Sequence, residues 1–362
     1  MKNRTAPLLA ALAAAVVGLP ASAQSTTNVS VYGVVDTGVE YQRATAGSKG
    51  PATTRKEMVN GTNAASRIGF RGTEDLGGGH RAFFVLEHGF NSDTGASTFT
   101  NFFARKAVVG LGGPWVELSL SSHLTPAFWA QFITDVNTFG LYGNSGTMSA
   151  FALTGMLRAS NGVNYVSPEF NGFRGRLLYT FGDERETAPK DAGRVIGVSG
   201  EYRSPTLSAA VFHQVRRSVF PANSTSSASN TYQGLTGLYN FGDWALSAGL
   251  TRFDPAGPST KTSGVTTSLW MGAILRFANS DLRLNLGQIR TDLKGATDGK
   301  SLLVGVNYSY QLSKRTNLYV GVGQVDNNAT AQIGLEGGSR AIPNNGLGSD
   351  TTVFGTGIRM TF

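Results

Sequence analysis

The sequence predicts an all-β protein, a sixteen-stranded antiparallel transmembrane β-barrel, and three observations lead to this prediction. Extended segments of roughly ten residues alternate apolar and polar side chains with a period of two. The connections between these segments alternate between short and long. Aromatic residues gather near the segment ends, as they do at the two interfaces of a membrane. After the N-terminal region, no helical pattern of period 3.6 competes with this reading.

The composition limits the class of protein. The chain has 362 residues, with 47 Gly, 12 Pro and no Cys, and hydrophobic residues make up 40%, below the usual share for a globular domain. The length would allow a large core or two domains, but long apolar runs are missing beyond the N-terminus. The absence of Cys fits an exported protein that avoids unwanted disulfides.

The N-terminus has the pattern of a secretory signal peptide. Lys2 and Arg4 precede an apolar run over residues 6–20, and Ala21-Ser22-Ala23 gives a small-x-small cleavage pattern. We expect residues 1–23 to be removed and residues 24–362 to form the barrel domain. A transmembrane anchor is the alternative, but the run is short for a spanning helix. Removal of two of the 31 basic residues leaves 29 against 23 acidic residues, a net charge of +6.

This positive charge points to anionic solutes and away from nucleic acid. The basic residues do not cluster in runs but are spaced along the expected strands, between Gly and hydrophobic residues. A basic patch for nucleic-acid binding is therefore not predicted. A positively lined interior is the better interpretation.

The sixteen expected strands follow one another from residue 29 to the C-terminus. They span residues 29–41, 66–74, 80–90, 102–111, 115–122, 158–166, 173–181, 194–203, 206–215, 231–241, 244–253, 265–277, 282–291, 301–311, 316–324 and 351–362. Seven short turns join them at residues 75–79, 112–114, 167–172, 204–205, 242–243, 278–281 and 312–315. Eight long loops occupy residues 42–65, 91–101, 123–157, 182–193, 216–230, 254–264, 292–300 and 325–350. Short periplasmic turns, long external loops and an even strand number are typical of outer-membrane barrels.

Sidedness supports each part of this series. In the second strand, Arg67 and Arg71 alternate with Ile68 and Phe70. Later strands alternate in the same way, as Leu282, Leu284 and Leu286 do with Arg283, Asn285 and Gly287, and the final strand places Phe354, Thr356, Ile358, Met360 and Phe362 on one face. One region departs from the rule, because Arg105 and Lys106 are adjacent and alternation would turn one of them towards lipid. A position at the outer rim and a position against a neighbouring subunit both remain open for this pair.

Several segments resemble the general porins of betaproteobacteria. Residues 28–41 (NVSVYGVVDTGVEY) resemble their opening strand, and residues 65–79 (ASRIGFRGTEDLGGG) are similar to their second strand and first turn almost residue for residue. Residues 82–90, 105–112 and 161–173, with the terminal Phe362, continue the likeness over the whole mature chain. One departure is Leu120-Ser121-Ser122-His123, where the family usually has Leu-Gly-Arg-Gln, so one expected pore-wall arginine is missing.

The resemblance implies a homotrimeric outer-membrane porin of a Gram-negative bacterium. It implies that the third external loop folds into the barrel and that small hydrophilic solutes diffuse passively through the narrowed channel. It also implies that outer-membrane lipid and lipopolysaccharide surround the barrel. The C-terminal Phe362 would be the signal read by the barrel assembly machinery.

Residues 123–157 form the candidate constriction loop. This segment has one formal charge, Asp135, and six aromatic residues. An external loop of that composition would expose much apolar surface, so we expect it to fold inside the barrel or to pack at a trimer centre. A barrel of sixteen strands is wide enough for an aqueous lumen, and the groups at its narrowest point decide its selectivity.

The inward parity of the strands supplies candidate pore-wall charges. The predicted constriction residues are Arg67, Arg71, Arg158, Arg174 and Arg176, together with Asp135 of the loop. The predicted lumen acids are Asp36, Glu40, Glu87 and Glu117, which offset part of the positive charge or pair with the arginines to stiffen the wall. Arg283 and Arg359 also have inward parity, at an unknown height. Because inward basic groups outnumber acidic ones, we expect a modest preference for small anions.

Catalytic and cofactor motifs are not apparent. The four His residues lack metal-ligand spacing, no phosphate-binding loop occurs, and no metal or cofactor is expected. Three alternatives stay open: a substrate-specific channel, an outer-membrane hydrolase that uses Ser122 and His123, and a soluble β-rich periplasmic binding protein. The hydrolase is disfavoured because neighbours on one strand face opposite ways.

Overall fold

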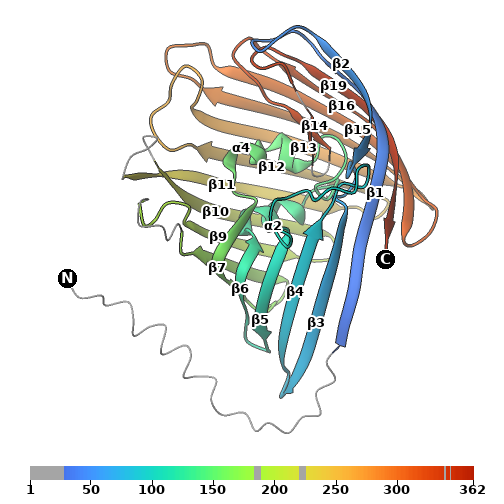
Figure 1. Ribbon diagram of the computed structural model, residues 1–362, viewed down its shortest axis with the longest axis vertical. Helices are drawn as coiled ribbons and strands as arrows, with labels where there is room; N and C mark the ends of the chain where they lie inside the picture. The colour runs from blue at the N-terminus through green and yellow to red at the C-terminus, as the bar shows by residue number, and fades with distance from the viewer. Residues whose placement is uncertain (1–27, 183–188, 220–225, 338–339, 343) are drawn as a thin grey trace.

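The computed structural model confirms the predicted barrel. It describes residues 28–182, 189–219, 226–337, 340–342 and 344–362, and the expected signal peptide at residues 1–23 lies outside them. Sixteen antiparallel strands close into a barrel, because β1 pairs with β19 at the end of the chain as well as with its sequence neighbours (Figure 1). None of the described helices is long and apolar enough to cross a membrane.

The strand bounds agree with the predicted segments to within a few residues at most ends. The barrel strands are β1 (Asn28–Ala44), β3 (Arg67–Gly77), β4 (His80–Gly89), β5 (Lys106–Gly112), β6 (Glu117–Leu124), β7 (Arg158–Val166), β8 (Phe173–Thr180), β9 (Val195–Arg203), β10 (Leu207–Val219), β11 (Ser227–Asn240), β12 (Trp244–Asp254), β13 (Val265–Arg276), β14 (Ser280–Asp292), β15 (Gly299–Gln311), β16 (Thr316–Asn327) and β19 (Thr351–Thr361). The connections alternate between short and long as predicted, and define a turn end and a loop end of the barrel.

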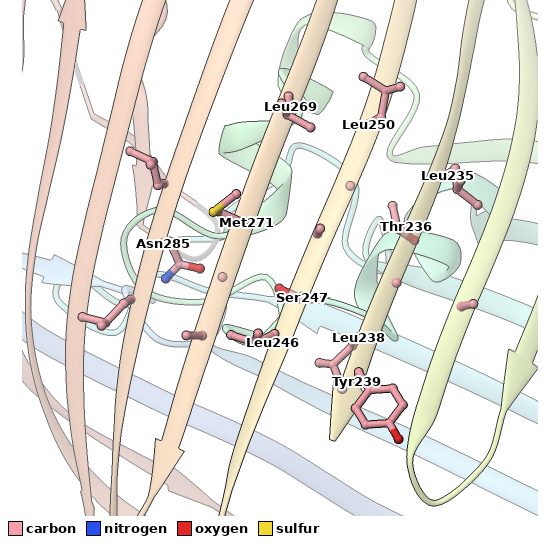
Figure 2. A pocket seen from close by; sticks show the side chains of 18 of the residues that line it. Leu235, Thr236, Leu238, Tyr239, Leu246, Ser247, Leu250, Leu269, Met271 and Asn285 are labelled. Carbon is pink, nitrogen blue, oxygen red and sulfur yellow. The ribbon is translucent and has the colours of Figure 1, made fainter. Parts of the chain in front are cut away.

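The period-two pattern separates the two faces of the wall. Along β12, exposed and buried residues alternate at every position. The exposed set is apolar from Trp244 to Leu250 and becomes charged only at the loop end of the strand. Leu250, Leu269 and Met271 line a hollow of about 870 Å³ on the outer face of neighbouring strands. Figure 2 shows these side chains, with helices of an inner loop on the far side of the sheet. An apolar outer face of this kind suits lipid.

Three segments differ from the expected boundaries. The first long loop contains an additional strand, β2 (Thr53–Asn60), which pairs with residues 37–44 of β1 while β3 pairs with residues 28–34. Its sequence, TTRKEMVN, is mostly polar and shows no apolar alternation, so the pattern did not reveal it. The fourth barrel strand begins at Lys106 and not at residue 102. The last long loop carries a small hairpin of β17 (Leu335–Gly337) and β18 (Arg340–Ile342).

Residues 123–157 fold inside the barrel, as the sequence predicts. They form three short helices, α2 (Pro126–Phe132), α3 (Ser145–Met148) and α4 (Phe151–Thr154), and α2 and α4 lie within the ring of strands (Figure 1). The largest buried clusters are made where this inner loop meets the wall. One cluster joins Tyr142 and Met148 to Trp270, Ile289 and Leu303. The core of the molecule is therefore the contact between loop and wall, and the loop is fixed in place.

Candidate functional site: a basic and aromatic cavity in the lumen

Tyr142 anchors the inner loop to the wall. Its hydroxyl donates to Glu40 Oε1 on β1 at 2.7 Å. Its backbone is held by the side chain of Asn307 on β15, which accepts from the Tyr142 N–H at 3.2 Å and donates to its carbonyl at 2.8 Å. Because Tyr142 is fully buried, these bonds are shielded from water and fix the loop against β1 and β15.

A track of glycines on β15, β16 and β19 makes room for Tyr142. A Cβ atom built at Gly305 or Gly355 would collide with the Tyr142 carbonyl or hydroxyl oxygen. At Gly323 it would lie 2.8 Å from Tyr142 Cβ, closer than real Cβ contacts. Gly at these positions allows the loop to approach the wall backbone closely.

Helix α2 is held against the opposite part of the wall. Thr125 caps its N-terminus by accepting from the Phe128 N–H, and Pro126 occupies the first turn, where no donor is lost. The Thr236 hydroxyl of β11 donates to the Ala130 carbonyl at 3.0 Å. On β10, Gln214 donates to the Met156 carbonyl at 3.1 Å, and the hydroxyl of the capping residue Thr125 donates to the same carbonyl at 2.8 Å. The helix is thereby positioned from both of its ends.

Between the inner loop and the first strands lies a cavity of about 370 Å³, which we call the lumen cavity. One side of it is basic and carries Arg67, Arg105, Lys106, Arg158 and Arg359. These residues come from β3, from the segment that leads into β5, from β5 itself, from β7 and from β19. Guanidinium groups keep their charge at any accessible pH, so their clustering creates a positive local potential.

Glu87 is the one carboxylate among the described residues that line the lumen cavity. It forms ion pairs with Arg105 at 2.8 Å and with Arg67 at 3.5 Å, and accepts a hydrogen bond from Tyr32 at 3.2 Å. Lys106, Arg158 and Arg359 make no ion pair within 4.0 Å with another described residue. The described lining thus holds five cations and one carboxylate, which pairs with two of them, and the cavity keeps an excess of positive charge.

The other side of the lumen cavity is aromatic. Phe128, Trp129 and Phe132 of α2 and Phe139 of the following segment line it. The rings touch one another, with centroids 5.4 Å apart for Phe128 and Phe132 and 4.8 Å apart for Phe128 and Phe139. This wall contributes no formal charge, so nothing on the loop side balances the basic side.

Asp135, the single charge of the inner loop, lies inside the loop itself. Its side chain accepts from the Phe139 N–H at 2.7 Å and from the Asn137 N–H at 3.1 Å, and the residue is 6% exposed. Burial raises the pKa of its carboxyl above the ordinary value of 3.8. Asp135 therefore closes a turn of the loop and is absent from the lining of the cavity.

The other predicted arginines divide by position. Arg67 and Arg158 line the lumen cavity, whereas Arg71, Arg174 and Arg176 lie outside its lining. The Arg71 guanidinium donates to Ser30 at 3.0 Å, and Arg174 pairs with Glu169 in the turn between β7 and β8 at 2.9 Å. Arg176 pairs with Glu201 at 2.6 Å, and its guanidinium carbon lies 4.9 Å from the centre of the Trp129 ring.

The predicted lumen acids are occupied by structural contacts. Asp36 accepts from the Tyr319 hydroxyl at 2.6 Å and from the Ala64 N–H at 2.8 Å. Glu40 accepts from Thr62 as well as from Tyr142. The last of the four acids, Glu117, pairs with Arg81 at 2.6 Å, close to the turn end of the barrel. Asp36 and Glu40 hold the first and third loops to β1, and their charges are buried.

The structure also settles where Arg105 and Lys106 point. Arg105 precedes β5, so strand alternation does not apply to it, and its side chain meets Glu87. Lys106 is the register partner of Glu87 and lines the same cavity. Neither residue faces lipid. Sequence parity missed this because the segment before Lys106 is irregular, although two adjacent cations were the visible signal.

Other candidate chemistry finds little support in the geometry. Among the described residues, no group of three or more His, Cys, Asp or Glu side chains could hold a metal ion. Ser122 accepts a hydrogen bond from Ser160 at 3.3 Å, and His123 Nε2 is buried without a partner among the described residues.

Comparisons with known proteins point in one direction. A family model described as Gram-negative porin matches residues 9–330. The outer membrane porin protein 32 of Delftia acidovorans is 30% identical over 365 residues, which cover 97% of this chain and 99% of the relative. An outer membrane porin protein of Bordetella pertussis is 28% identical, covering 85% of this chain and 91% of the relative. The solved structure titled anion-selective porin from Comamonas acidovorans aligns with a TM-score of 0.79 and 28% identity, covering 93% of this chain and all of the other.

Proposed function

Because this chain belongs to the family of Gram-negative porins, channel proteins of the outer membrane, we propose that it passes small hydrophilic solutes by passive diffusion with a modest preference for anions. The lumen cavity serves as the constriction at which this preference arises. Arg67, Arg105, Lys106, Arg158 and Arg359 are the proposed selectivity residues.

One observation carries the proposal. Five cations on the barrel side of the lumen cavity face a loop that offers no charge, and Glu87 alone offsets them within the lining. A narrow passage with charges of one sign on low-dielectric walls concentrates ions of the opposite sign. The structural neighbour from Comamonas acidovorans, which is titled anion-selective, supports the same direction.

Reversal potentials in planar lipid bilayers test this proposal. With a gradient of KCl across the bilayer, the zero-current potential should have the sign that corresponds to a chloride permeability above that of potassium. Repeating the measurement at higher salt should reduce the preference, because screening shortens the range of the fixed charges. A cation-selective reversal potential at low salt would overturn the anion preference while leaving the channel itself intact.

We propose no catalytic role for Ser122 and His123. The Ser122 hydroxyl accepts from Ser160 at 3.3 Å, and among the described residues no hydrogen bond joins it to the His123 ring, whose Nε2 is buried without a partner. Ester hydrolysis by the purified protein, lost in Ser122→Ala, would contradict this assignment.

We further propose a homotrimer embedded in outer-membrane lipid and lipopolysaccharide. Phe99 and Phe102, in the second long loop, are 37% and 62% exposed, and a neighbouring subunit would cover them. We propose Phe362 as the signal for the barrel assembly machinery. It is 47% exposed on the apolar outer side, and its backbone pairs with Gly33 in both directions.

A further inference from the structure

The two walls of the lumen cavity differ in chemistry, and this difference selects a type of anion. The basic wall would attract any small anion. The aromatic wall of Phe128, Trp129, Phe132 and Phe139 has no role in binding chloride, because an inorganic anion gains nothing from ring faces. A solute that uses both walls must carry a negative charge at one end and a flat apolar group at the other.

We infer that the lumen cavity is a binding site for small aromatic carboxylates, a substrate class within the proposed anion preference. The carboxylate would lie against the basic wall, where Arg158 and Lys106 have no ion-pair partner among the described residues. The ring would lie against Phe132 and its neighbours. This inference rests on the proposed function and adds a chemical class to it.

The size of the cavity suits such a solute. Its volume of about 370 Å³ falls within the roughly 300–1,000 Å³ of pockets that hold small organic molecules. Both walls are needed to enclose a molecule that carries one charge and one ring.

The aromatic wall is held in place before any solute arrives. Phe139 packs edge-on against Phe151, which stacks on Tyr232 of β11 at 5.3 Å between ring centroids. Phe128 also packs against this buried cluster. Phe132 contacts the rings of Phe128 and Trp129, and all three line the cavity. Little conformational entropy is lost when a solute binds to a preformed surface.

The basic wall is similarly fixed. The Arg158 side chain donates to the Arg105 carbonyl at 3.0 Å, and Arg105 is in turn held by Glu87. A bound carboxylate would meet guanidinium groups whose positions are already set, which favours charge-assisted hydrogen bonds.

The test is block of the potassium chloride current by benzoate, with propionate and benzylammonium as matched probes. Benzoate has both the ring and the charge, propionate has the charge alone, and benzylammonium has the ring with the opposite charge. In the wild-type trimer, benzoate should reduce the current saturably and bind about two- to tenfold more tightly than propionate, the range expected for ring contacts. Benzylammonium should not block. Equal affinities for benzoate and propionate would overturn the inference.

Two variants separate the contributions of the walls. Phe132→Leu keeps an apolar side chain but removes the ring, so it should bring benzoate close to propionate without changing the reversal potential. Arg158→Gln should weaken both anions together and leave their ratio unchanged. Phe170→Leu, in an exposed turn outside the lumen, is the matched control and should behave like the wild type.

The outcomes distinguish this inference from the function on which it rests. A chloride-selective channel that binds benzoate no better than propionate would refute the aromatic site alone. A cation-selective channel would refute the anion preference first. If Phe132→Leu does not assemble, Phe139→Leu makes the same test, and retention of the full benzoate advantage in a folded variant would contradict the inference.

Discussion

The cations of the lumen cavity jointly set its potential but differ in how they are paired. Arg67 and Arg105 share Glu87, whereas Arg158 donates to a backbone carbonyl and pairs with no carboxylate among the described residues. Loss of Arg158 should therefore remove net positive charge without leaving a carboxylate unpaired. Loss of Arg158 should therefore change ion selectivity more than it changes the stability of the fold.

Arg158→Gln should shift the reversal potential towards that of a less anion-selective channel. Lys261→Gln is the matched control, since Lys261 is exposed in the loop between β12 and β13, two strands that contribute no residue to the cavity lining. Reversal potentials for both variants in the same salt gradient provide the measurement. Equal shifts in the two variants would mean that overall charge, and not the lumen cavity, decides selectivity.

Asp135 should be silent in selectivity. Asp135→Asn removes the only formal charge of the inner loop. Its single amide oxygen can still accept from one of the two N–H groups, that of Asn137 or that of Phe139, which bond to separate carboxylate oxygens in the wild type. The reversal potential should stay at the wild-type value. A shift towards stronger anion preference would show that the carboxylate acts on the pore.

The pH dependence of stability provides a second test of Asp135. The folded state raises the pKa of this carboxyl above 3.8, so the folded protein holds the proton at higher pH than the unfolded chain does. Its contribution to stability is therefore lost as pH rises above about 4. In Asp135→Asn this loss should disappear, and melting temperatures measured across that range should fall less than in the wild type.

The elements show which parts of the molecule a sequence can reveal. Alternating strands such as β12 were predictable because one face meets lipid and the other meets the interior. The polar strand β2 was not predictable, because its sequence shows no alternation between apolar and polar residues. Its strand conformation depends on pairing with β1 in the folded protein. Inward parity predicted that Arg67, Arg71, Arg158 and Arg174 face the interior, and Arg67 and Arg158 line the lumen cavity. The height of Arg71 and Arg174 along the barrel depends on strand stagger. Periodicity does not encode that stagger.

The inner loop should loosen when its anchor is weakened. Tyr142→Phe removes the hydrogen bond to the Glu40 carboxylate, worth about 1.5–3 kcal/mol for a charged acceptor, while the ring still fills the glycine track. Single-channel recordings should show more current fluctuation with little change in mean selectivity. Tyr239→Phe, on the exposed outer face, should record like the wild type. Identical noise in both variants would argue against Tyr142 as the anchor.

A charged residue introduced on the outer face should destabilise the barrel more when it lies deeper in the bilayer. Met271 lies midway along β13, and Phe277 follows its last residue at the turn end. Met271→Arg should cost about 2–4 kcal/mol in the free energy of unfolding from lipid vesicles, and Phe277→Arg about 0–1 kcal/mol. Denaturant titrations of both variants give the comparison. Equal costs would contradict a bilayer centred on the middle of β13.

At the scale of the whole molecule, the strands form the barrel wall and the inner loop narrows its interior. The barrel supplies an interior, and buried carboxylates on β1 hold the loops that occupy it. The inner loop then brings an uncharged aromatic surface opposite a basic wall. The sequence alone indicated the barrel and the excess of inward arginines. It could not indicate that Asp36 and Glu40 accept hydrogen bonds that hold the loops, because these bonds join segments distant in the chain.

Single-channel current through the purified protein in a planar bilayer tests this account most directly. A water-filled lumen narrowed by the inner loop should give discrete, long-lived steps whose size rises with salt concentration, and whose zero-current potential in a salt gradient favours chloride. Membranes that contain correctly inserted protein and yet carry no current would contradict the account, because the loop would then plug the barrel completely.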